Sequence, residues 1–308
     1  MSVIITSGWK YSDIDVLASG IALKELFEHE KEEVYLCLPG PFNASIVPEM
    51  KGWVGDQLSA HPPEHAMNSQ VILVDISDPH HVAPFVVVDN VVEVFDHHHG
   101  YENFWQQRIG AKAKIVPIGA CATLIWEEYK VRSLSGSISD VSANFLYAAI
   151  VSNTLNFKAQ ITHERDETAA FELKSYTTLP SDWVQHYYSH IERNMLVDLK
   201  SAIEKDTKSI QIDRLKFKFS QLELFNVSSL FNPAQKQCNL AAMMDELFLE
   251  EPWLLSLISI EEGCNYIFTN SREISEALGR VIKINSFDYY LKSEKLWLRK
   301  EILAQLMK

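Results

Sequence analysis

The sequence contains few cysteines, and their spacing excludes the common zinc and redox motifs. Four cysteines occur among 308 residues, at Cys37, Cys121, Cys238 and Cys264. Zinc knuckles and thioredoxin-like redox sites need two cysteines separated by two residues, and no such pair is present. We therefore interpret all four as small buried hydrophobic residues of a protein from a reducing compartment.

The chain also lacks an excess of basic residues and lacks long apolar runs. Its 28 Lys and Arg are outnumbered by 41 Asp and Glu, which gives a formal net charge of −13. Broad binding to duplex nucleic acid requires many cations against phosphates, so we expect no duplex nucleic acid as a partner. No apolar run approaches the length of a membrane span, and the N-terminal segment is unlike a signal peptide. We therefore expect a cytoplasmic protein with no membrane partner.

The first half of the sequence alternates between short apolar strands and helical patterns. Strands are predicted at residues 3–6, 33–38, 70–74 and 90–95, and helices at 16–28, 120–130, 139–151 and 165–176. This alternation is typical of an α/β domain with a doubly wound, mainly parallel sheet. Asp166, near the start of the last predicted helix, is interpreted as an exposed acid favoured by the helix dipole.

The pattern changes after the segment TTLPSDW, residues 177–183, which lies between helical patterns. We place a boundary near residues 183–194, which gives a first domain of residues 1–188 and a smaller second domain of residues 195–308. In the second domain, strands are predicted at residues 217–227, 253–260 and 265–268, and helices at 239–249 and 298–307. This order predicts a mixed α+β domain.

Acids and histidines gather where the predicted strands of the first domain end. Asp13 and Asp15 follow the first strand, Asp75 ends the third, and the run from Asp96 to His99 ends the fourth. In a parallel sheet these ends meet at one edge, which is where open α/β sheets bind ligands. No GxGxxG motif, Walker loop or nucleophile elbow is present to suggest another kind of site.

This combination of groups favours a metal site at that edge. Crowded carboxylates repel one another and raise each other's pKa unless a cation lies among them. Carboxylate oxygens mixed with imidazole nitrogens suit Mn²⁺, and Co²⁺, Mg²⁺ or Zn²⁺ could also bind. The alternative is that these acids are loop residues and helix caps, and Asp13 could cap the following helix. Because three separate strand ends carry such groups, we favour the metal site.

The order of these motifs resembles that of the DHH phosphoesterase family. The motifs are SDID at 12–15, VDISDP at 74–79, FDHHH at 95–99, IGACAT at 118–123 and IVSNTLNFK at 150–158. The length of the chain and the sequence of its second half resemble the branch of family II inorganic pyrophosphatases and exopolyphosphatases. The segments that carry this resemblance are LVDLK at 196–200 and WLRKEI at 297–302. No Gly-Gly-Gly-His stretch occurs, which argues against the nanoRNase and single-strand exonuclease branch.

The resemblance implies a metal-dependent phosphohydrolase whose active site lies in a cleft between two domains. Its substrate would be a small phosphorylated compound, either a phosphoanhydride such as pyrophosphate or short polyphosphate, or a small phosphoester. The implied metal ligands are Asp13, Asp15, Asp75, His97 and Asn153. A possible homodimer is a further implication of the resemblance.

The resemblance also implies roles in substrate binding and catalysis for five residues near those ligands. Asp96 would orient a histidine by accepting its second N–H, and His98 would contact a phosphoryl oxygen or assist the leaving group. Lys200 and either Arg299 or Lys300 would bind the distal phosphate, and Arg suits bidentate contact better than Lys.

Two ligand positions depart from the pyrophosphatase pattern. Trp9 stands where those enzymes have a metal-binding His, and Asn153 stands where they have an Asp. An indole offers a metal no lone pair, and an amide oxygen brings no charge. We therefore expect one strong metal position at Asp15, Asp75, His97 and Asn153, and a weak one at Asp13 and Asp75.

These departures leave two further functions open. A nucleotide or oligonucleotide phosphoesterase could stack a base on Trp9, Tyr101 or Trp105, although core packing is the favoured role of these aromatic residues. A catalytically impaired relative could instead bind a phosphorylated ligand or a protein partner as a sensor.

Overall fold

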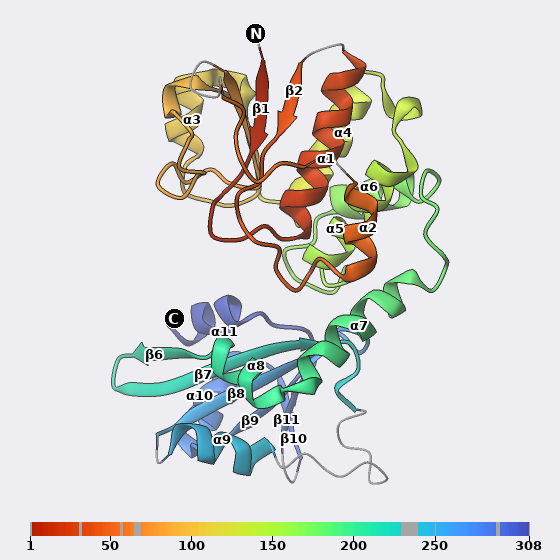
Figure 1. Cartoon of the computed structure of the whole chain (residues 1–308). Coiled ribbons are helices and arrows are strands. Elements are labelled where there is room, and N and C mark those ends of the chain that lie inside the picture. Colours follow the sequence, from red (N-terminus) through yellow and green to blue (C-terminus); the bar gives the residue numbers. More distant parts are fainter. Residues whose placement is uncertain are drawn as a thin grey trace. The chain divides into compact units, whose positions relative to one another are not determined.

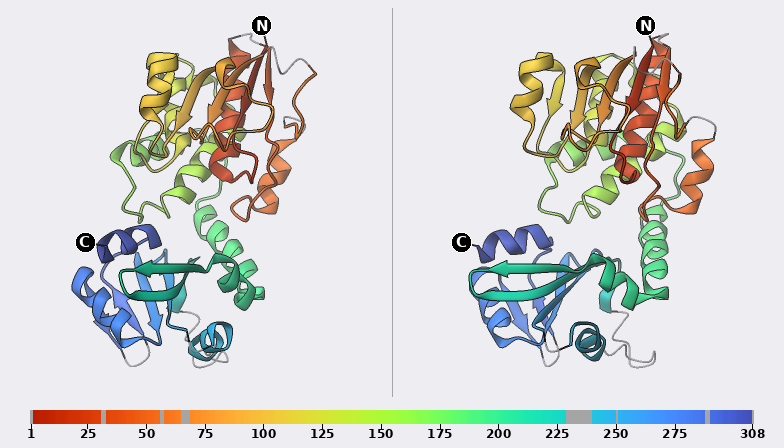
Figure 2. Two further views of the ribbon diagram at one scale, coloured as in Figure 1. Left: turned by 90° about the vertical axis from the view of Figure 1, so that its left-hand side faces the viewer. Right: turned by 60° about the vertical axis from the view of Figure 1, so that its left-hand side comes forward.

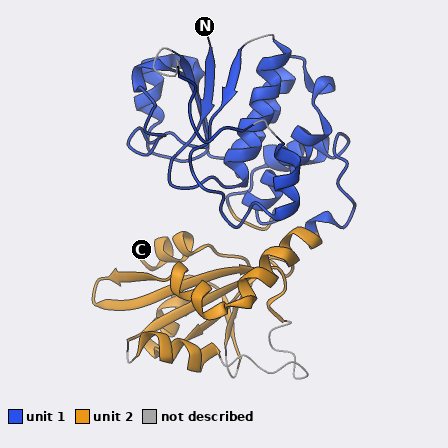
Figure 3. Ribbon diagram, viewed as in Figure 1, with its two compact units in different colours: residues 1–157, 161–184 blue, residues 158–160, 185–308 orange. Residues whose placement is uncertain are grey.

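The computed structural model of the chain divides into two units, each built around its own sheet (Figure 3). Unit 1 comprises residues 1–157 and 161–184, and unit 2 comprises residues 158–160 and 185–308. The structure describes residues 2–30, 33–55, 58–64, 69–228, 240–249, 251–287 and 290–307. None of the helices in these ranges is both long and apolar enough to cross a membrane.

Unit 1 contains a five-stranded parallel sheet whose strand order is β2-β1-β3-β4-β5 (Figure 1). The strands are β1 (Val3–Thr6), β2 (Val34–Leu36), β3 (Gln70–Val74), β4 (Val91–Asp96) and β5 (Ala113–Ile115). Most apolar residues of β1 to β4 are buried because helices cover both faces of the sheet. The order reverses between β1 and β3, and doubly wound sheets bind ligands outside the carboxyl ends of such a pair.

The helices of unit 1 cover both faces of this sheet. They are α1 (Ile14–His29), α2 (Pro48–Val54), α3 (Glu102–Ile109), α4 (Cys121–Val131), α5 (Asp140–Asn153) and α6 (Glu164–Leu173). Helices α1, α4, α5 and α6 contact one another, whereas α3 packs on β4 and β5 on the other side of the sheet (Figures 1 and 2). Short 3₁₀ turns lie at Val88–Asn90, Gly110–Lys112 and Ser135–Ser137.

Unit 2 contains a six-stranded mixed sheet in the order β10-β11-β9-β8-β7-β6. Its strands are β6 (Lys208–Ile212), β7 (Leu215–Leu224), β8 (Trp253–Ser259), β9 (Cys264–Thr269), β10 (Ile284–Ser286) and β11 (Leu291–Ser293). Strands β7 and β8 pair in parallel, and the other pairs are antiparallel.

The helices of unit 2 bury both faces of its sheet. They are α7 (Trp183–Val197), α8 (Leu199–Asp206), α9 (Leu240–Phe248), α10 (Arg272–Val281) and α11 (Arg299–Leu306). One hydrophobic cluster joins α8 and α9 to the sheet, and a second joins α10 and α11 to it. The predicted fold class, a doubly wound parallel sheet followed by a mixed α+β part, is confirmed.

Candidate metal centre

The N-terminus of α1 carries the first two acids of the predicted site. Asp13 is the N-cap of this helix, because its Oδ1 accepts hydrogen bonds from the backbone N–H of Asp15 (3.1 Å) and of Val16 (3.0 Å). Asp13 therefore caps the helix, as the alternative interpretation of this residue predicts. Asp15 is fully buried, and its two oxygens accept hydrogen bonds from the N–H groups of Cys121 and Ala122, each at 2.8 Å. Its charge thus lies at the N-terminus of α4, where a helix dipole stabilises an anion.

Asp75 comes directly after β3 in a strained backbone conformation. Its φ is 54°, in the left-handed region, and its N–H donates to Phe95 O at 2.8 Å. Non-glycine residues held in this region often lie at functional sites, where the surrounding structure offsets the strain. The Oδ1 of Asp75 is buried, and apart from an ion pair with His97 it has no hydrogen-bond partner among the described residues.

Two histidines after β4 are oriented by hydrogen bonds from their Nδ1 atoms. The Nδ1 of His97 lies 3.0 Å from the carbonyl oxygen of Ile118, which can only accept, so Nδ1 carries the proton. The Nδ1 of His98 lies 2.8 Å from Oδ1 of the fully buried Asp96, which also accepts from the N–H groups of His97 and His98. When neutral, each ring therefore offers its Nε2 lone pair, which is how a second hydrogen bond prepares a histidine for a metal.

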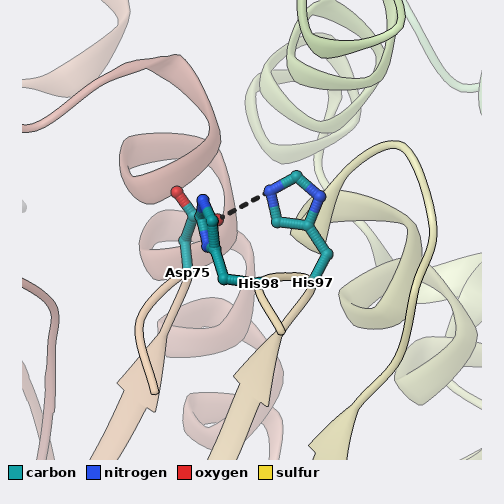
Figure 4. Close-up of side chains that lie close together, drawn as sticks. All are labelled: Asp75, His97 and His98. Carbon is teal, nitrogen blue, oxygen red and sulfur yellow. Dashed lines mark ion pairs between the residues drawn. The ribbon is translucent and has the colours of Figure 1, made fainter. Parts of the chain in front are cut away.

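The acids and histidines converge at the carboxyl ends of β3 and β4. We call Asp15, Asp75, His97 and His98 the acid–imidazole cluster. The Nε2 of His97 lies 3.3 Å from Asp75 Oδ1 and 3.9 Å from Asp15 Oδ2, and the Nδ1 of His98 lies 3.8 Å from Asp75 Oδ1. Figure 4 shows Asp75 beside His98, with the ion pair from Asp75 to His97 dashed. Potential ligand atoms of Asp75, His97 and His98 lie within 4.8 Å of one another.

Burial makes the charges of this cluster depend on one another. Burial raises the pKa of Asp15 to about 6, and burial together with the Asp15 charge raises the pKa of Asp75 to about 8. Burial alone would lower the pKa of His97, but the carboxylates of Asp75 and Asp15 raise it to about 10. The hydrogen bond to Asp96 raises the pKa of His98.

These groups fit a divalent cation. Without a metal, protons balance the buried carboxylates, and a bound cation would take over that role. The buried Oδ1 of Asp75 and the Nε2 of His97 are together a donor set of the kind that Mn²⁺ or Zn²⁺ binds.

Asn153, the last residue of α5, faces the cluster as a hydrogen-bond donor. Its side-chain nitrogen donates to Asp15 Oδ2, the same oxygen that accepts from Cys121. The amide thus supports the charge of Asp15, whereas a carboxylate at this position would repel it. As a metal ligand, Asn153 stays a prediction.

The turn between β5 and α4 supports the cluster through Asp166. This residue is fully buried, its Oδ2 accepts from Gly119 N (2.8 Å), and its Oδ1 accepts from the Thr123 hydroxyl (2.6 Å). The prediction that Asp166 is exposed is therefore wrong. A side chain at Gly119 would place its Cβ 2.7 Å from Asp166 Oδ2, so the turn requires glycine. This turn supplies both the Ile118 carbonyl that orients His97 and the N–H groups that bind Asp15.

The residues predicted to bind the distal phosphate all lie in unit 2. Lys200 on α8 pairs with Glu246 on α9 at 2.5 Å. Arg299 is mostly buried and donates to both carboxylate oxygens and to the backbone oxygen of Asp206. Lys300 is exposed. Arg299 therefore joins α11 to the end of α8, and all three residues stay predictions as phosphate ligands.

A cavity of about 390 Å³ opens beside the cluster. Asp13, Asp75 and His98 line it together with Trp9 and Tyr11, two aromatic residues of the loop between β1 and α1. Trp9 is exposed, so core packing was the wrong expectation for it. Core packing is right for Trp105, which is fully buried and donates its indole N–H to Ser77 O at 2.6 Å.

Comparisons with known proteins agree with the fold and the motifs. No family model matches the chain. The chain is 24% identical over 259 residues to a probable manganese-dependent inorganic pyrophosphatase of Bacillus cereus, covering 81% of this chain and 80% of that protein. A candidate family II inorganic pyrophosphatase of Methanococcus jannaschii superposes over 100% of this chain and 98% of its own, with 17% identity and a TM-score of 0.57.

A second solved structure shares the fold. An exopolyphosphatase-related protein of Bacteroides fragilis superposes with a TM-score of 0.54 and 12% identity, covering 99% of this chain and 90% of that one. The resemblance to the DHH phosphoesterases of the pyrophosphatase and exopolyphosphatase branch, predicted from the motifs, is confirmed.

Proposed function

We propose that this chain is a metal-dependent phosphohydrolase that acts on a small phosphorylated substrate at the acid–imidazole cluster. The observation that carries the proposal is the buried pair of Asp75 Oδ1 and His97 Nε2, which lie 3.3 Å apart and share no further hydrogen-bond partner among the described residues. Such an arrangement is costly unless a proton or a cation occupies it, and perturbed groups of this kind mark functional sites.

The metal of this proposal is Mn²⁺. Asp15, Asp75 and His97 would hold it, with Asn153 beside them, and Asp13 with Asp75 would hold a second, weaker ion. A bound Mn²⁺ would polarise a phosphoryl oxygen and lower the pKa of a bound water, which supplies the nucleophile. Support for manganese comes from the donor set and from the name of the Bacillus cereus relative.

The residues of this chain would bind and orient the substrate. Asp96 holds the Nδ1 of His98, so the exposed ring presents its Nε2 to a phosphoryl oxygen. Because the pKa of His98 is raised by Asp96, the ring keeps its proton to higher pH and can donate it. Lys200, Arg299 and Lys300 remain the proposed ligands of the distal phosphate.

Pyrophosphate and short polyphosphate are the first substrates to test. The full chain, stripped with a chelator, would be given each compound and an aryl phosphate with Mn²⁺, Co²⁺, Mg²⁺ or Zn²⁺, and released phosphate measured. We expect release that requires the metal and that falls at least about a hundredfold in Asp75→Asn, because a charged ligand inside a cleft contributes several kcal/mol.

Asp89→Asn is the matched control for this experiment. Asp89 is exposed in the turn before β4, outside the cluster, so the same chemical change there leaves the rate unchanged. Turnover that persists in Asp75→Asn contradicts the proposed site. Metal and phosphate binding without any turnover would instead support the catalytically impaired binding protein.

A further inference from the structure

Two aromatic side chains are exposed on the short loop between β1 and α1. Trp9 is 47% exposed and Tyr11 is 56% exposed, although large rings of this kind are normally buried. Both line the same cavity as Asp13, Asp75 and His98. Exposed apolar surface at the wall of a cavity marks a place where a ligand binds.

The loop that carries these rings is fixed at its two ends. At one end, Gly8 pairs with Val82 in an antiparallel bridge, and Ser7 O accepts from Ala83 N at 2.9 Å. At the other, Ser12 N donates to Pro41 O at 2.9 Å.

The middle of the loop is held as well. Gly40 packs directly on the backbone of Tyr11, where a Cβ at Gly40 would come within 2.7 Å of the Tyr11 carbonyl carbon. Since the backbone is ordered before a ligand arrives, the rings of Trp9 and Tyr11 can bind one at a smaller entropic cost.

The size and chemistry of the cavity exceed what an inorganic phosphate compound can use. Its volume of about 390 Å³ lies within the range of sites for organic ligands, roughly 300 to 1,000 Å³. Pyrophosphate carries no apolar surface, so an exposed indole contributes nothing to its binding. A ligand that contacts both the aromatic residues and the acid–imidazole cluster must combine a phosphate group with a planar ring.

We propose that Trp9 and Tyr11 form a stacking subsite for the base of a nucleotide whose phosphate lies at the acid–imidazole cluster. The position of the phosphate rests on the proposed function, whereas the stacking itself does not. Stacking a base on an aromatic side chain contributes about 1–3 kcal/mol and tolerates any base, because every base has a π-face. Trp9, which stands where the pyrophosphatases have a metal ligand, would thus exchange a metal contact for a contact with the base.

A pair of ligands that differ by the base alone tests this subsite. Adenosine 5′-monophosphate and ribose 5-phosphate share the ribose and the phosphate, and calorimetry would measure their binding to the Mn²⁺-loaded full chain. We expect the nucleotide to bind about 5- to 150-fold more tightly, which corresponds to the energy of stacking one base. Trp9→Ala should remove this preference without changing the affinity for ribose 5-phosphate, and Trp9→Phe should keep part of it.

Phe171→Ala is the matched control. Phe171 lies on α6, is 84% exposed and does not line the cavity, so its removal leaves the preference for the nucleotide intact. Equal affinity for the two ligands, undetectable binding of the nucleotide, or a preference that survives Trp9→Ala would each overturn the subsite.

The same measurements separate the subsite from the proposed function. If pyrophosphate is hydrolysed but the two ligands bind equally, the subsite fails and the hydrolase stands. If the nucleotide binds through Trp9 while no phosphate compound is hydrolysed, the hydrolase fails and the subsite stands.

Discussion

The side-chain nitrogen of Asn153 donates a hydrogen bond to Oδ2 of Asp15, a fully buried carboxylate that also accepts two backbone N–H groups from the start of α4. A buried charge is tolerated only when such donors compensate for the lost water. The amide therefore stabilises the metal-free protein at the position where the pyrophosphatase pattern has an Asp.

Asn153→Asp should lower the stability of the metal-free protein and raise its affinity for the metal. The new carboxylate would replace a donor to Asp15 by a like charge, so we expect the metal-free protein to lose about 1–3 kcal/mol of unfolding free energy. With Mn²⁺ bound, the added charge faces the cation, and the affinity should rise at least about tenfold. Urea unfolding and calorimetric metal titration measure the two effects.

Asn153→Ala is the matched variant for that prediction. It removes the donor without adding a charge, so it should destabilise the metal-free protein and leave the Mn²⁺ affinity no higher than in the wild type. An equal gain in affinity from Asn153→Ala and Asn153→Asp would contradict the electrostatic explanation.

Asp75→Asn should abolish the stabilisation of the protein by the metal. The amide replaces a buried carboxyl group whose pKa is raised by burial and by Asp15, and its oxygen can still accept a hydrogen bond from His97, so the metal-free variant should be about as stable as the wild type. Asn also tolerates the left-handed backbone at this position, so the fold is preserved. Saturating Mn²⁺ should add about 2.7 kcal/mol to the wild type at a concentration a hundred times Kd, and close to nothing to the variant. A melting temperature that Mn²⁺ raises equally in both proteins would show that the ion binds elsewhere.

Sequence patterns predicted those strands that are buried on both faces. The apolar runs that form β3 and β4 were placed to within one residue, because such β-branched segments need cover on each side. Strand β5 was missed because its three residues are only half buried, and β6 because polar residues interrupt its few apolar ones. Helix α10 was missed although its buried residues, Ile274 and Leu278, show helical spacing.

The convergence of the site was predictable, but its hydrogen bonds were not. Parallel strands end at one edge, and this rule alone brings Asp75 and His97 together. The direction of the Asn153 amide and the burial of Asp166 depend instead on how α5 and α6 pack on the start of α4. Spacing within one segment holds no information about such contacts, which join residues far apart in the chain.

Asp166→Ala should destabilise unit 1 and weaken metal binding together. The substitution leaves the N–H of Gly119 and the Thr123 hydroxyl without their buried acceptor, which costs about 2–4 kcal/mol of unfolding free energy. The turn also carries the Ile118 carbonyl that orients His97, so the Mn²⁺ affinity should fall. Asp140→Ala, an exposed acid in the first turn of α5, is the control and should change stability by less than about 0.5 kcal/mol.

A loss of stability no greater in Asp166→Ala than in Asp140→Ala would show that water replaces the carboxylate. A loss of stability without weaker Mn²⁺ binding would show that the turn holds its shape around His97 without Asp166.

Arg299 and Lys300, adjacent on α11, should respond differently to replacement by Met. Arg299→Met breaks the contacts to Asp206 in a largely buried position, so we expect unit 2 to lose about 1–3 kcal/mol, which urea unfolding followed by circular dichroism would detect. Lys300 is exposed, so Lys300→Met should leave stability within about 0.5 kcal/mol of the wild type.

If Lys300 binds phosphate, its replacement should raise KM for pyrophosphate with little change in kcat, because a cation held on the distal phosphate binds ground state and transition state alike. An unchanged KM in Lys300→Met would remove Lys300 from the site. A normal unfolding curve for Arg299→Met, combined with a raised KM, would show that Arg299 acts on the substrate and not on the fold.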